Sequence, residues 1–176
     1  MKNFAIHPVG VIVWIWLLIV LGPLVALSYF FAVLLHELGH FCVAKFLGYK
    51  LSRFSISPYG VSLSYLDNQL QKGDGLKIAF AGPCANFLAV IIVLGLWWCF
   101  PNFYFLSYDF VLISTMLALI NLLPAYPLDG GRIFVDVASY FFSEKVAKKI
   151  TVVLNILLSV FFMLVFVVMC FINFNP

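Results

Sequence analysis

YFFAVLLHELGHFCVAKF, from Tyr29 to Phe46, is an apolar run long enough to cross most of a bilayer, and it carries the pentapeptide HELGH. Residues four apart on a helix share one face, so His36 and His40 can present both imidazoles to one metal ion. Glu37 is offset from this pair and can reach a water at the metal. Two histidines and a carboxylate are unfavourable in lipid unless they have a role. The pattern therefore indicates a metal site, and a zinc site that hydrolyses peptide bonds is the first interpretation.

The composition of the chain is typical of an integral membrane protein. Of its 176 residues, 65% are hydrophobic and 10% are charged, whereas soluble domains carry about a quarter charged residues. We therefore expect a single membrane-embedded domain over residues 1–176. No basic run suggests nucleic-acid binding. The four cysteines form no CxxC pair, so they indicate neither a disulfide framework nor a thiolate zinc site.

The apolar segments predict an all-α polytopic membrane protein with five to six transmembrane helices. A transmembrane helix needs roughly 20 apolar residues. Five segments approach this length: Val9–Leu27, Ser28–Leu47, Ile78–Phe100, Phe110–Ala125 and Ile150–Ile172. A sixth segment, Arg132–Phe142, is weaker and amphipathic, and it is either a helix at the membrane interface or the start of another span.

The ten lysine and arginine residues fall in alternate flanks of these segments. The positive-inside rule therefore places the N-terminus in the cytoplasm and the C-terminus outside. In this orientation His36 and His40 lie towards the cytoplasmic end of the second span.

Residues Leu51–Leu66 follow a different pattern, in which apolar residues alternate with serines. The alternation is broken at Pro58–Gly60, so it predicts a short membrane-associated β-hairpin. The hairpin is either a cytoplasmic surface feature or an edge strand that pairs with an extended substrate. In the second case Gly60 and Val61 at the tip would contact the substrate.

A catalytic zinc site needs a third protein ligand besides the two histidines. The downstream candidates are Asp67, Asp74, Asp109, Asp129, Asp136 and Glu144. Asp129 follows the fourth span on its cytoplasmic side, at a depth that matches the two histidines. Its setting, PLDGG, breaks a helix and lets backbone and carboxylate approach closely. Asp129 is therefore the favoured third ligand, and a solvated aspartate at an ordinary helix end is the alternative.

Two ordered motifs resemble the signatures of the site-2 protease family of intramembrane zinc metalloproteases. They are HELGH at His36–His40 and NLLPAYPLDGGR at Asn121–Arg132, and AGPCAN at Ala81–Asn86 resembles a further family element. The resemblance is to the membrane core alone, because no CBS or PDZ module is recognisable. Within the family the chain is most similar to the sporulation proteases that process a membrane-associated sigma-factor precursor.

This resemblance implies specific roles for individual residues. Glu37 would act as general base and then as general acid. Asn121 and Pro124 would lie beside the substrate, although a helix–helix hydrogen bond for Asn121 and a helix-shaping role for Pro124 remain alternatives. One Zn²⁺ per chain would be bound by His36, His40 and Asp129.

The implied function is regulated intramembrane proteolysis in a bacterial cell membrane. The expected partners are a membrane-associated protein substrate, the lipid bilayer and regulatory or inhibitory membrane proteins, with homo-oligomerisation left open. Three other interpretations are an inactive metal-binding scaffold that sequesters client proteins, a metalloprotease that uses Glu144 as a ligand, and a metal transporter. Glu37 argues against the scaffold, because zinc binding alone does not need it.

Overall fold

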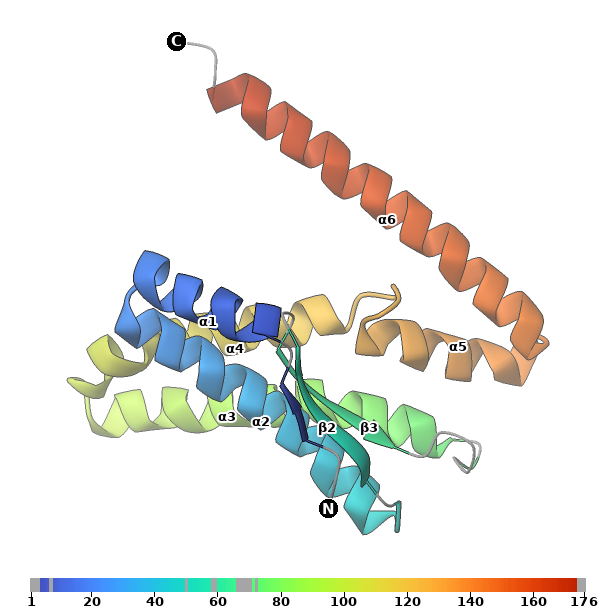
Figure 1. The fold of residues 1–176 in the computed structure, drawn as a ribbon, viewed down its shortest axis with the longest axis horizontal. Helices are drawn as coiled ribbons and strands as arrows, with labels where there is room; N and C mark the ends of the chain where they lie inside the picture. The colour runs from blue at the N-terminus through green and yellow to red at the C-terminus, as the bar shows by residue number, and fades with distance from the viewer. Residues whose placement is uncertain are drawn as a thin grey trace. The chain divides into compact units, whose positions relative to one another are not determined.

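A computed structural model describes residues 4–6, 8–49, 51–57, 60–65, 71 and 73–173 of the chain. The chain forms two compact units, Met1–Asn121 and Leu122–Pro176. The first unit contains β1 (Phe4–Ile6), α1 (Pro8–Leu21), α2 (Pro23–Phe46), β2 (Leu51–Ser57), β3 (Gly60–Tyr65), α3 (Asp74–Cys99) and α4 (Phe103–Asn121) (Figure 1). The second unit contains α5 (Asp129–Phe141) and α6 (Glu144–Asn173).

The first two helices meet at Gly22 and Pro23, a glycine–proline pair inside the apolar segment Val9–Leu27. Gly22 has a φ of 83°, a left-handed conformation that glycine adopts without strain. Proline follows at the first helical position, where its missing N–H is tolerated. As a result α1 has 14 residues and a length of about 21 Å, which is less than the roughly 30 Å of a bilayer's hydrocarbon core.

Four helices in the described part of the chain are long and apolar enough to cross a membrane: α2, α3, α4 and α6. This number is lower than the predicted five to six. The first predicted span is shortened by the break at Gly22, and the sixth segment is the separate helix α5, which has 13 residues and ends at Phe141. The chain is a multi-pass membrane protein that is mostly helical, with one small sheet.

The small sheet has the strand order β1-β2-β3. β2 and β3 pair in antiparallel fashion, with Ile56 opposite Val61 and Ser57 opposite Gly60, over the segment in which alternation predicts a hairpin. Residues 58 and 59 of the predicted tip lie outside the described residues. The sequence did not predict β1, which pairs in parallel with β2 and has only three residues. Among the described strands, β3 therefore occupies an edge of the sheet.

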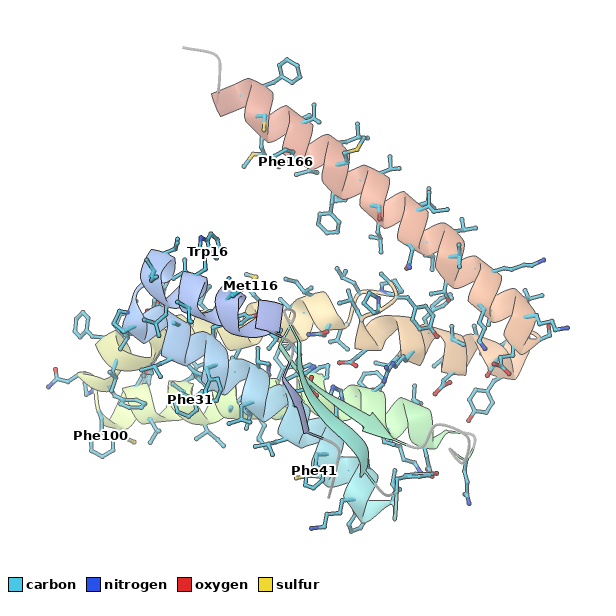
Figure 2. The ribbon with its side chains drawn as sticks, viewed as in Figure 1. Trp16, Phe31, Phe41, Phe100, Met116 and Phe166 are labelled. Carbon is cyan, nitrogen blue, oxygen red and sulfur yellow. The ribbon has the colours of Figure 1, made fainter. Side chains whose placement is uncertain are left out.

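Helices α2, α3 and α4 run side by side in the first unit, and small residues let them approach closely (Figure 1). A β-carbon at Gly39 of α2 would lie 2.5 Å from the carbonyl oxygen of Ala81 and 2.8 Å from the β-carbon of Ala85. Close approach of this kind is typical of helix pairs in membranes. Large apolar side chains such as Phe31 and Phe100 are exposed, as expected for lipid-facing surfaces (Figure 2).

A polar cluster joins the end of α2 to the start of α3. The Tyr49 hydroxyl donates a hydrogen bond to the Asp74 carboxylate at 2.8 Å and accepts one from the backbone N–H of Gln71 at 3.0 Å. The Lys77 ammonium also donates to Asp74, at 2.9 Å. Asp74 is therefore engaged in holding the interhelical connection.

The second unit is organised around the apolar face of α5. Val135 and Ala138 of α5 are buried against Ala147 of α6, with Phe134 packed beside them. Along the chain, residues Leu122–Leu128 form an irregular loop that connects α4 to α5. An 18-residue window of α6 is strongly apolar, as expected for a membrane span.

Candidate metal centre

Helix α2 places His36 and His40 one turn apart, with their rings close together. Both side chains are buried. Their Nε2 atoms are 3.2 Å apart, and the two rings meet edge to face with centroids 4.8 Å apart. The sequence prediction that both imidazoles share one helix face is confirmed, because the spacing of four residues brings two potential ligand atoms to one point.

A hydrogen bond that His40 donates to α3 fixes which of its nitrogens can bind a metal. His40 Nδ1 lies 2.7 Å from the carbonyl oxygen of Ile78. A carbonyl oxygen can only accept, so Nδ1 carries the proton and Nε2 keeps its lone pair. A carbonyl partner on the other ring nitrogen is a common arrangement for metal-binding histidines.

Gly82 of α3 packs directly against both imidazoles. A β-carbon at this position would lie 2.8 Å from His36 Nε2 and would overlap with His40 Nε2. No side chain larger than glycine fits there unless the histidines move. Two converging Nε2 atoms and one fixed tautomer suit a zinc ion, which binds imidazole nitrogen readily.

Glu37 lies next to His36 on α2, but its side chain is only half-buried. One residue along a helix is a rotation of about 100°, so its carboxylate leaves the face that carries the two imidazoles. A carboxylate that is close to the histidines but directed differently can exchange protons with a water or a substrate without being a metal ligand.

Asp129, in the second unit, is the first residue of α5 and is 9% exposed. Two glycines shape its surroundings. A β-carbon at Gly130 would overlap with the carbonyl oxygens of Leu122 and Leu123, and one at Gly131 would lie 2.7 Å from the carbonyl group of Ala125. The loop before Asp129 is therefore folded tightly against the start of α5, which holds the carboxylate in a defined position.

The predicted substrate-contacting residues lie in three different elements. Asn121 ends α4, and its side-chain amide donates to the carbonyl oxygen of Leu117 in the same helix at 2.9 Å. Pro124 is half-buried in the loop that follows. Gly60 and Val61 begin β3, the edge strand, paired with Ser57 and Ile56 on its inner side.

Other carboxylates considered as ligands are engaged elsewhere or are not described. Glu144 forms an ion pair with Lys148 one turn along α6, which weakens the interpretation that uses Glu144 as a ligand. Asp74 bonds to Tyr49 and Lys77. Asp67 lies outside the described residues.

Asp136 of α5 is the remaining carboxylate on the cytoplasmic side of the predicted topology. Burial raises the pKa of Asp136, and the nearby negative charge of Glu144 raises it further, while Arg132 opposes both effects.

Sequence reasoning missed the individual roles of Gly82 and Asn86, which it treated only as members of the AGPCAN element. Asn86 is fully buried one turn beyond Gly82, and neither atom of its amide has a hydrogen-bond partner among the described residues. A small residue beside a proline in the middle of an apolar span was the available signal for Gly82. The bare sequence offers no comparable signal for the surroundings of Asn86.

Comparison with known proteins gives a consistent result for both units. The family described as Peptidase family M50 matches residues 24–108 and 100–168. A zinc metalloprotease of Methanocaldococcus jannaschii is 37% identical over 139 residues, which cover 75% of this chain and 40% of the relative. Stage IV sporulation protein FB of Bacillus subtilis is 27% identical over 138 residues, which cover 73% of this chain and 45% of that protein. The chain thus spans less than half the length of these curated relatives.

A solved structure is also similar. The site-2 protease from Methanocaldococcus jannaschii matches with a TM-score of 0.73 and 29% sequence identity. The match covers 98% of this chain and 85% of the solved chain.

Proposed function

The chain belongs to peptidase family M50, and on this basis we propose that it is an intramembrane zinc metalloprotease. Its proposed substrate is a transmembrane or membrane-associated protein. The observation that carries the proposal is the pair of converging Nε2 atoms of His36 and His40 beside Gly82. A histidine pair buried in an apolar helix is unfavourable unless it binds a partner.

The proposed zinc ligands are His36, His40 and Asp129. Together they offer two imidazole nitrogens and one carboxylate oxygen, which is a ligand set that zinc uses in hydrolytic sites. Zinc, when bound, lowers the pKa of a water molecule and polarises a carbonyl group. His36 and His40 are buried in the first unit, and Asp129 is buried at the start of α5 in the second.

Glu37 is the proposed catalytic base. Its half-buried carboxylate accepts a proton from the attacking water and then donates it to the nitrogen of the leaving amine. Asn121, Pro124 and the start of β3 are proposed to hold the substrate near the cytoplasmic face.

An extended substrate explains why the chain carries a small sheet among its helices. A peptide bond in a helix is protected by hydrogen bonds, so the substrate helix must unwind before cleavage. In lipid, the freed N–H and C=O groups need new partners. We propose that the substrate pairs with the edge strand β3 near Gly60 and Val61. By resemblance to the sporulation proteases, a sigma-factor precursor is the first substrate to test.

The proposal is tested by co-expressing the chain with single-span or membrane-attached candidate substrates. Wild type should cleave at least one of them, and Glu37→Gln should retain zinc but lose cleavage. Zinc content is measured by elemental analysis of the purified chain. If neither form cleaves any candidate and both form a metal-dependent complex with one, the protein is a scaffold and not a protease.

A further inference from the structure

We propose that Asn155 of α6 is a positioning residue for Asp129, and that it acts by holding the loop that precedes this carboxylate. The inference rests on the proposed function, because it takes Asp129 to be a zinc ligand. All the residues involved lie within the second unit.

The side-chain amide of Asn155 forms two hydrogen bonds with the backbone of a single residue. The N–H of Tyr126 donates to Asn155 Oδ1 at 2.9 Å, and Asn155 Nδ2 donates to the carbonyl oxygen of Tyr126 at 3.2 Å. The amide therefore satisfies both polar groups of Tyr126, as a neighbouring strand would. An irregular loop near a membrane needs such a partner, since lipid cannot satisfy its backbone.

Thr151, another polar residue of α6, forms its side-chain hydrogen bond within the helix, unlike Asn155. The Thr151 hydroxyl donates to the carbonyl oxygen of Ala147, one turn earlier in α6. Thr151 thus satisfies itself locally, whereas the Asn155 amide is directed to a residue 29 positions away.

Tight packing carries the restraint from Tyr126 to Asp129. The N–H of Leu128 donates to the carbonyl oxygen of Ala125 at 2.9 Å, so the chain turns around Tyr126. The N–H of Gly131 then donates to the carbonyl oxygen of Leu128 at 3.1 Å. Because Gly130 and Gly131 leave no space between the loop and α5, the loop and the start of α5 form one packed piece. Releasing Tyr126 should therefore loosen the position of Asp129.

The test compares zinc affinity, measured by competition with a chelator, in the full chain purified in detergent. Asn155→Leu removes both hydrogen bonds, keeps a similar volume and suits an apolar helix. We expect it to weaken zinc binding about 10-fold, the lower end of the range for residues that orient metal ligands. Asn155→Gln keeps both amide groups and should recover part of the affinity. Ser159→Ala, one turn further along α6, is the matched control and should bind zinc as wild type does.

Repeating the measurement in an Asp129→Ala background separates positioning from general destabilisation. If Asn155 acts through Asp129, Asn155→Leu should cause no further loss once Asp129 is gone. An equal loss in both backgrounds would overturn the inference, as would wild-type affinity in Asn155→Leu. If Asn155→Leu does not insert into the membrane, Asn155→Ser is compared in the wild-type and Asp129→Ala backgrounds instead. A wild-type chain that neither binds zinc nor cleaves any substrate would instead refute the proposed function.

Discussion

Replacing Gly82 with alanine is the sharpest test of the close contact between this residue and the two histidines. The new β-carbon would lie 2.8 Å from His36 Nε2 and 2.5 Å from His40 Cε1, whereas ordinary contacts begin at 3.4 Å. The His36 ring would have to retreat by about 0.6 Å and the His40 ring by at least about 0.9 Å, while zinc–ligand distances tolerate deviations of about 0.2 Å. We therefore expect Gly82→Ala to reduce zinc affinity at least about 10-fold, by analogy with the loss of ligand-orienting contacts.

The same helix supplies a control for the intrinsic effect of alanine. Gly95 also lies in α3, and a β-carbon there would meet nothing within 4 Å. Gly95→Ala should therefore stabilise the helix by up to about 1 kcal/mol and leave zinc binding unchanged. Gly82→Ala gains the same helix propensity, but overpacking of the site should lower the stability by about 1–3 kcal/mol.

The assay measures zinc affinity by chelator competition and thermal unfolding for both variants beside wild type. If Gly82→Ala and Gly95→Ala bind zinc equally well, the close contact with Gly82 does not determine how the two imidazoles bind the metal. The converging imidazoles would then need another explanation.

Three further predictions concern stability and the substrate strand. Asn86→Leu should unfold at the same temperature as wild type or higher, because neither amide atom has a hydrogen-bond partner among the described residues; a clear loss of stability would reveal a structural hydrogen bond. Asp136→Asn should raise the melting temperature at neutral pH, because burial and Glu144 disfavour the charged carboxylate. This gain should vanish as the pH falls through the raised pKa and below 3.8, where wild-type Asp136 is protonated in both folded and unfolded states; a gain that persists in acid would contradict the sign. Leu63→Pro removes an N–H from β3 and should impair cleavage more than zinc binding; equal losses would exclude substrate pairing with this strand.

The histidine pair was predictable from sequence because its geometry is local. A spacing of four residues on a helix determines which face both rings share, whatever the rest of the chain does. The antiparallel strands at Leu51–Ser57 and Gly60–Tyr65 were predictable for the same reason, since alternation is a local signal. The helix break at Gly22 also has a local signal, because a glycine–proline pair interrupts an otherwise continuous apolar sequence.

Features that depend on contacts between distant segments were not predictable. The hydrogen bond from His40 to Ile78 joins residues 38 positions apart. The bonds between Asn155 and Tyr126 join residues 29 positions apart. Nothing in the single sequence links these pairs. The strand β1 was missed because three residues are too few for any periodicity to be visible.

The contacts between α2 and α3 have a consequence for how a substrate gains entry. Gly39 brings the two backbones together, the Ile78 carbonyl holds His40, and Gly82 fits against both imidazoles. Sliding or separating these helices would break all three contacts at once. We therefore expect the two helices to stay together, and a gate that admits a substrate to open through other elements of the fold.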